Sequence, residues 1–142
     1  MSIVLAMLLA SAAPPAVEHI GEPSIGGRRL PFSDAVRVGD MLYLSGQIGN
    51  KPDGSLPPGI EAQTRQAMDN IATVLKGQGL GWNHVVKCTV MLDEIKDWPA
   101  FNAVYVTYFE GGKFPARSAF GADGLAMGAL VELECWAHVP QK

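Results

Sequence analysis

Three segments of the chain alternate between apolar and polar side chains, as half-buried β-strands do. They span residues 41–48, 85–92 and 130–139, and a shorter segment of the same kind covers residues 118–122. The first follows residues 35–38 across a Gly-Asp turn, which predicts a hairpin. The apolar faces of the three long strands are expected to carry Leu42, Leu44, Ile48, Val86, Cys88, Val90, Leu92, Val131, Leu133, Cys135 and Ala137.

Two other segments repeat apolar residues every three or four positions, which is the period of an amphipathic helix. The first begins near Ile60 and ends among the glycines of residues 77–81. The second begins at residues 97–99, where an aspartate and an early proline favour a helix start, and it ends before residues 111–112. Its apolar stripe is predicted to consist of Phe101, Val104, Tyr105, Tyr108 and Phe109.

These elements predict an α+β fold, a two-layer sandwich with two helices on one face of a mostly antiparallel sheet. The helices cover the apolar strand faces, and no further element is available for the opposite face. Left in water, the Trp, Tyr and Met side chains there would form a large apolar patch. We therefore expect a homo-oligomer that associates through this face, with a small-molecule site at the interface. The face is predicted to carry Tyr43, Gln47, Lys87, Met91, Glu132 and Trp136.

The first residues are considered apart from the domain. Residues 3–10 are apolar and lead into Ala-Ser-Ala, which is typical of a signal-peptide cleavage site, but no basic residue precedes them. The run is too short to span a bilayer. Two interpretations stay open: a cleaved signal of a periplasmic or secreted protein, or a frayed or packed terminal segment of a cytoplasmic one. We assign residues 1–16 to this segment and residues 17–142 to one domain.

Composition narrows the function classes. The chain is 48% hydrophobic and 18% charged, as globular proteins are, and its net charge of −3 argues against nucleic-acid binding. Arg28, Arg29 and Arg37 could still form a local basic patch. Cys88 and Cys135 are too few for a disulfide scaffold, and neither lies in a metal-binding motif, so we expect no metal and two inert thiols packed in the core.

Arg117 is the strongest candidate for chemistry. Pro115 stiffens the approach to a predicted strand, and Arg117 stands where that strand opens. A guanidinium is planar and matches a carboxylate with two hydrogen bonds. Taken alone, an arginine at the start of a strand is more often a surface or ion-pair residue.

Several short motifs, however, together resemble the Rid/YjgF family of reactive-intermediate deaminases. The resemblance covers roughly residues 30–139. It rests on five motifs in the family's order: Ser-Gly-Gln-Ile at 45–48, a helix at 61–70, Val-Val-Lys-Cys-Thr-Val at 85–90, Phe-Asn-Ala-Val-Tyr at 101–105 and Phe-Pro-Ala-Arg-Ser at 114–118, with Glu132 fifteen residues after the arginine.

The resemblance implies a fold similar to trimeric chorismate mutase, with three subunits packed sheet to sheet and a site at each interface. It implies cofactor-free hydrolysis of enamine or imine intermediates, from 2-imino acids to 2-oxo acids and ammonia. In this sequence Arg117 would bind the substrate carboxylate, and Glu132 would hold and polarise the attacking water. Asn102 would reach the pocket, and Gly46 would offer its backbone to the ligand.

Glu132 also allows a plainer interpretation, as a strand charge that faces solvent or pairs with Lys87. Glu134 has the same facing and no equivalent role in the family, so we regard it as structural.

Two positions depart from the family pattern. The family's Gly-Pro-Tyr-Ser-Gln segment reads Leu-Pro-Phe-Ser-Asp at residues 30–34, so Phe32 supplies an aromatic wall without the ligand-contacting hydroxyl. Ala119 stands where Cys or Thr is frequent, and only its backbone N–H remains as a donor. Both changes make the pocket more apolar. They favour a rival function, a trimer that binds a small carboxylate metabolite without turnover. Cleavage of RNA, linked with some family members, is disfavoured by the acidic balance.

Overall fold

A computed structural model describes residues 13–141 of the chain. It contains one seven-stranded sheet in the order β1-β4-β5-β9-β7-β8, with β6 paired to β9, and a separate two-stranded sheet of β2 and β3. The strands are β1 (Val17–Ile20), β2 (Ser24–Ile25), β3 (Arg28–Arg29), β4 (Ala35–Val38), β5 (Met41–Leu44), β6 (Gln47–Ile48), β7 (Val85–Leu92), β8 (Ala116–Gly121) and β9 (Val131–His138), and the α-helices are α1 (Ile60–Gly77) and α2 (Trp98–Tyr105).

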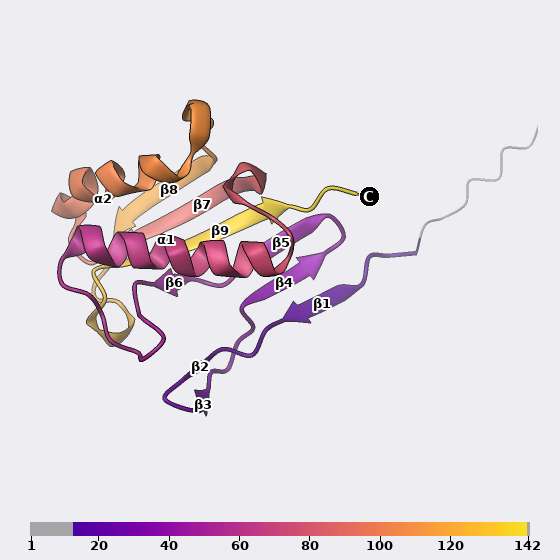
Figure 1. The fold of residues 1–142 in the computed structure, drawn as a ribbon, viewed down its shortest axis with the longest axis horizontal. Coiled ribbons are helices and arrows are strands. Elements are labelled where there is room, and N and C mark those ends of the chain that lie inside the picture. The colour runs from indigo at the N-terminus through magenta and orange to yellow at the C-terminus, as the bar shows by residue number, and fades with distance from the viewer. Residues whose placement is uncertain (1–12, 142) are drawn as a thin grey trace, which may run out of the picture.

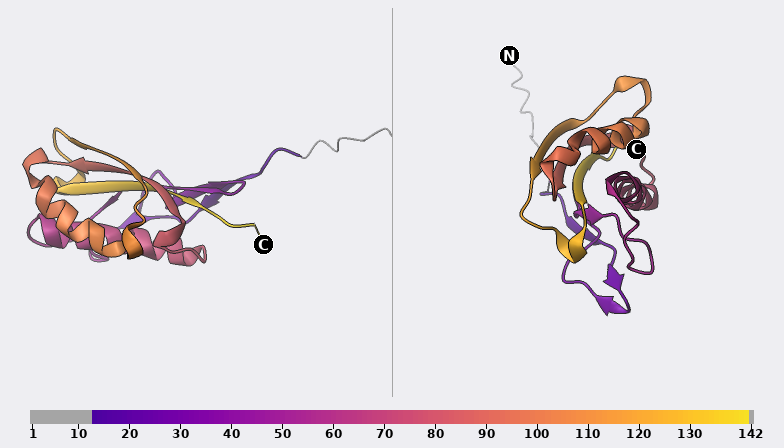
Figure 2. Two further views of the ribbon diagram at one scale, coloured as in Figure 1. Left: turned by 90° about the horizontal axis from the view of Figure 1, so that it is seen from above. Right: turned by 90° about the vertical axis from the view of Figure 1, so that its left-hand side faces the viewer.

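The two helices lie side by side on one face of the large sheet, and the other face is uncovered (Figures 1 and 2). Strands β7 and β8 run parallel, and the remaining pairs are antiparallel. The predicted α+β class, with a mostly antiparallel sheet and two helices on one face, is confirmed. No helix within residues 13–141 is long and apolar enough to cross a membrane.

The core lies between the sheet and the helices. It is formed by the alternate strand residues that face the helices and by the helix residues, three or four positions apart, that face the sheet. In β9 the buried positions alternate strictly, as predicted, and α1 turns one stripe toward them. Gly49 lets the helix approach closely, because a Cβ atom there would collide with the backbone of Gln63. The least exposed large side chains are Phe101, Leu42, Met68, Ile71, Leu75, Leu92, Leu133, Val90 and Val131.

Val86 is the position where the predicted strand faces were wrong. It is 43% exposed, whereas Val85 is 8% exposed and belongs to the core. The register of β7 against β9 shifts between Val85 and Lys87, as in a β-bulge. The extra residue moves Val86 to the uncovered face, and alternation resumes at Cys88.

The two cysteines are not free thiols. Cys88 and Cys135 occupy opposed positions on β7 and β9, with their Cα atoms 4.1 Å apart, and they form a disulfide. Both lie on the buried apolar face, as expected. The prediction of two inert thiols was wrong. The apolar faces of both strands were predicted, but a face does not show which residues of β7 and β9 pair, so the sequence did not show that the two cysteines are opposite each other.

Three short strands at the N-terminal side were not predicted. Strands β1, β2 and β3 are two to four residues long and mostly exposed, so they leave no alternation to detect. β1 extends the large sheet beyond β4, and the β2–β3 hairpin projects from the same edge (Figure 1). The apolar run at residues 3–10 and its predicted cleavage site lie outside the described residues.

Candidate functional site

Arg117 lies in an aromatic cradle formed by helix α2. It is the second residue of β8 and opposes Cys88 on β7, so its side chain faces the helices. Its guanidinium carbon, Cζ, lies 4.7 Å from the ring centre of Tyr105, 5.7 Å from that of Phe101 and 5.8 Å from that of Trp98. These distances are in the range of cation–π contacts, which fix the plane of the guanidinium.

One edge of the guanidinium is held by Asn102. Arg117 Nη1 donates a hydrogen bond of 2.8 Å to Asn102 Oδ1. One stripe of α2 holds the arginine. It begins at Trp98 and continues three, four and seven positions later with Phe101, Asn102 and Tyr105. Asn102 Oδ1 is the only acceptor that this guanidinium reaches within residues 13–141, and the other four of the five guanidinium N–H bonds make no hydrogen bond there.

A cavity of about 410 Å³ opens beside this arginine, which is half-buried. It is a pocket of the size of a small metabolite with an oriented cation in its wall, as a carboxylate site requires. The cavity is lined by Asn102, Tyr105, Val106, Phe114, Pro115 and Arg117.

Glu132 lies elsewhere, on the uncovered face of the sheet. It is half-buried on β9 opposite Met91, and its carboxylate rests against Gly46. A Cβ atom at Gly46 would collide with Glu132 Oε1, so the absence of a side chain at this glycine lets the carboxylate lie against its backbone. Within the described part of the chain no ion pair joins Glu132 to a base, and the predicted alternative of pairing with Lys87 is not observed.

The environment of Glu132 favours its protonated form. Burial raises the pKa of this carboxyl above its ordinary value of 4.5, and the negative charge of Glu134 raises it further. A carboxyl with a raised pKa can both accept and return a proton at a pH nearer to neutral.

Phe32 marks a third location. Its ring is 46% exposed and lines a cavity of about 630 Å³ with Ser33 and Ser45. Ser45 Oγ donates a hydrogen bond of 2.7 Å to the carbonyl of Ser33, which ties the Phe32 segment to the residue before Gly46.

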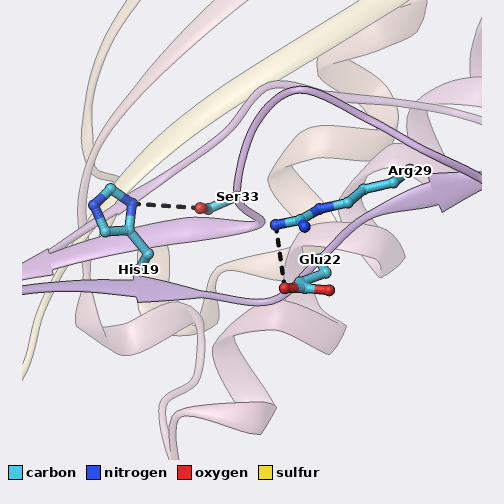
Figure 3. Close-up of polar contacts among 4 residues, drawn as sticks. All are labelled: His19, Glu22, Arg29 and Ser33. Carbon is cyan, nitrogen blue, oxygen red and sulfur yellow. Dashed lines mark hydrogen bonds and ion pairs between the residues drawn. The ribbon is translucent and has the colours of Figure 1, made fainter.

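His19 and Arg29 also line this cavity, and each makes one polar contact (Figure 3). His19 on β1 reaches Ser33 Oγ over 3.5 Å, and Arg29 on β3 pairs with Glu22 at 3.1 Å. Both contacts are exposed to solvent, so they contribute little to stability.

Arg117 and Glu132 therefore do not meet within one chain. Arg117 shares a row of the sheet with Cys88, whereas Glu132 shares a row with Met91, three residues along the same strand. The separation is about 10 Å along the strands and two strands across, and the side chains leave opposite faces. One chain therefore holds two separate groups of residues: the Arg117 group, with Asn102, and the Glu132 group, with Phe32, Ser45 and Gly46.

Two residues remain to be placed: Ala119, which was predicted at the site, and Tyr105, which was not. Ala119 is on the same face as Arg117, two residues along β8, and packs against the core. Tyr105 was predicted only as part of the apolar stripe of α2, because its spacing fits a core position. Its position under the guanidinium follows from the packing of β8 beside α2, which the sequence alone does not show.

Comparisons with known proteins show the family and the fold. The sequence profile of the family described as Endoribonuclease L-PSP matches residues 27–139. The chain belongs to this family, which includes the Rid/YjgF proteins. The goat protein named 2-iminobutanoate/2-iminopropanoate deaminase is 43% identical over 109 residues, which cover 75% of this chain and 79% of that protein.

Two solved structures share the fold. The Rid family protein YyfA from Yersinia pestis, described as of unknown function, has a TM-score of 0.79 and 40% identity, with 87% of this chain and all of that chain covered. E. coli TdcF, solved with bound serine, has a TM-score of 0.78 and 26% identity, and the match covers 87% of this chain and 99% of that one.

Proposed function

We propose that this Rid family member hydrolyses 2-imino acids to 2-oxo acids and ammonia. The observation that carries the proposal is Arg117, held by aromatic rings and Asn102 with its remaining N–H bonds directed to no other residue in the described part of the chain. The names of its deaminase relatives and the serine in TdcF support a ligand with an amino-acid-like carboxylate.

The uncovered sheet face supports a trimer in which two copies complete each site. Val86, Phe120 and Trp136 are exposed there, and Trp136 packs edge to face on Tyr43 with ring centres 5.2 Å apart. An apolar sheet face of this kind is covered by self-association. The Arg117 group of one copy would then meet the Glu132 group of its neighbour and complete one site, with Phe32 as an aromatic wall and Ala119 behind the arginine.

The chemistry needs only these groups and water. The substrate carboxylate binds Arg117, and Glu132 accepts a proton as water adds to the carbon of the protonated imine, which gives a neutral amino alcohol. Glu132 then returns this proton to the nitrogen, and the carbon–nitrogen bond breaks with ammonia as the leaving group. The hydroxyl gives its own proton to the Glu132 carboxylate and becomes the carbonyl of the 2-oxo acid. Among residues 13–141 no three His, Cys, Asp or Glu side chains gather as a metal site would require.

Arg117→Ala is the direct test. Purified protein is expected to accelerate ammonia release from 2-iminopropanoate generated by an amino-acid oxidase. The variant should lose about ten- to a hundredfold in kcat/KM, since a charge-assisted hydrogen bond contributes roughly 1.5–3 kcal/mol. Arg65→Ala, which removes an exposed arginine on α1, is the matched control and should keep full activity. Equal activity of the Arg117 variant would contradict the proposal.

Glu134→Gln should change the pH dependence. As a general base Glu132 acts when ionised, so activity rises with pH through its pKa, which burial and Glu134 hold above the ordinary value. Removing the negative charge of Glu134 lowers the pKa of Glu132, and the acidic limb of kcat/KM should move to lower pH. An unmoved limb, or a move to higher pH, would show that Glu132 is not the titrating base.

Ligand binding without turnover is the rival that Phe32 and Ala119 favour. Calorimetry with 2-oxobutanoate separates the two functions, because saturable binding with no acceleration of imine hydrolysis would support a binding protein. The family description also includes ribonuclease activity. RNA cleavage that disappears in Arg117→Ala would support that function instead.

A further inference from the structure

Tyr105 carries a buried hydroxyl that the fold leaves without a partner. The residue is 2% exposed, and within residues 13–141 its hydroxyl makes no hydrogen bond. Tyr108, three residues later, shows the ordinary arrangement, because its hydroxyl donates to Asp69 Oδ1 at 2.8 Å. A buried hydroxyl without a partner destabilises a protein, so its presence in a tightly packed core requires a reason.

The position of Tyr105 points to a ligand. It is one of the six residues that line the cavity beside Arg117, and the guanidinium lies over its ring at 4.7 Å. Phe101 and Phe109 pack on the ring at 5.3 and 4.9 Å, so the side chain is fixed from the other sides. Because the hydroxyl is buried beside a ring that the guanidinium covers, its contact with a bound anion requires Arg117 to shift toward that anion.

The hydroxyl has the protonation state of a donor. Burial raises the pKa of Tyr105 above the ordinary tyrosine value, more strongly than the charge of Arg117 lowers it, so the phenol stays neutral at physiological pH. A neutral phenol donates one hydrogen bond, and a carboxylate oxygen is its best acceptor.

We propose that the Tyr105 hydroxyl is a substrate-binding group, which donates a hydrogen bond to the carboxylate that Arg117 anchors. The proposal rests on the proposed function only as far as a small carboxylate binds at Arg117. It assigns to Tyr105 a binding role that its place in the apolar stripe of α2 does not suggest.

Tyr105→Phe is the test, with Tyr108→Phe as the matched control. The dissociation constant of 2-oxobutanoate, measured by calorimetry on the full-length protein, should rise about tenfold in Tyr105→Phe. The melting temperature without ligand should stay the same or rise, because the change removes an unpartnered polar atom. Tyr108→Phe should do the reverse, with a lower melting temperature and unchanged affinity.

Three results would overturn the assignment. The first is an unchanged dissociation constant in Tyr105→Phe, and the second is the absence of 2-oxobutanoate binding by the wild type. The third is a melting temperature that falls as in Tyr108→Phe, which would show that the hydroxyl already has an internal partner. The function is tested separately: if the wild type binds 2-oxobutanoate and Tyr105→Phe weakens binding, the assignment holds even where no imine is hydrolysed. An active deaminase with unchanged affinity in the variant contradicts the assignment alone.

Discussion

Glu132→Gln is expected to lower kcat for imine hydrolysis by a hundredfold or more, the range typical for the loss of a general base. Glutamine matches glutamate in size and can still rest against Gly46, but it cannot accept a proton from water. KM should change little, because the carboxylate anchor is Arg117. Steady-state ammonia release under saturating oxidase measures both parameters, and Glu61→Gln, at the exposed start of α1, is the control.

Mixed assemblies test whether the site is divided between copies. Arg117→Ala and Glu132→Gln chains are each expected to be nearly inactive. Unfolded together in equal amounts and refolded, they should regain activity, because about a quarter of the interfaces in a cyclic trimer pair an intact arginine with an intact glutamate. No recovery would mean that each site uses both groups of one chain, against the opposed placement in β8 and β9.

Loss of the Cys88–Cys135 disulfide is expected to lower the free energy of unfolding by about 4 kcal/mol, the chain-entropy estimate for a loop of this length. The bond joins positions 47 residues apart across the two central strands of the core. Urea unfolding with and without dithiothreitol, at one fixed protein concentration, measures the difference.

The double variant Cys88→Ala with Cys135→Ala serves as the control for this measurement, since reductant should leave its unfolding curve unchanged. A thiol titration under denaturing conditions provides the decisive count. Free thiols in protein that has never met reductant would contradict the disulfide.

Much of the fold was predictable because a strand or helix that buries one face has apolar residues at regular intervals along the sequence. The alternation in residues 130–139 and the helical repeat after Ile60 each predicted their element and its buried face. Prediction failed where a single residue changes the geometry. The bulge at Val86 leaves the composition of its strand unchanged, and only the pairing with β9 shows that this side chain points outward.

The site was less predictable than the fold. The alternation of residues 130–139 placed Glu132 on the uncovered face, where the structure has it, but no face was predicted for Arg117, which precedes the predicted strand of residues 118–122. The distance between the two residues depends on the register of β7, β8 and β9, as does the pairing of Cys88 with Cys135. The role of Tyr105 was hidden for another reason: an aromatic residue at helical spacing has the same pattern in a core and under a guanidinium.

The opposed facing of Arg117 and Glu132 also has a genetic consequence. In the assembly proposed above, every chain contributes its arginine to one subunit interface and its glutamate to the other. A chain that lacks both groups but still folds would therefore disable sites on both of its sides when it assembles with intact chains. Such an allele would act in a dominant-negative manner in a cell that also carries the normal gene. Loss of expression from the same allele would only halve the amount of enzyme.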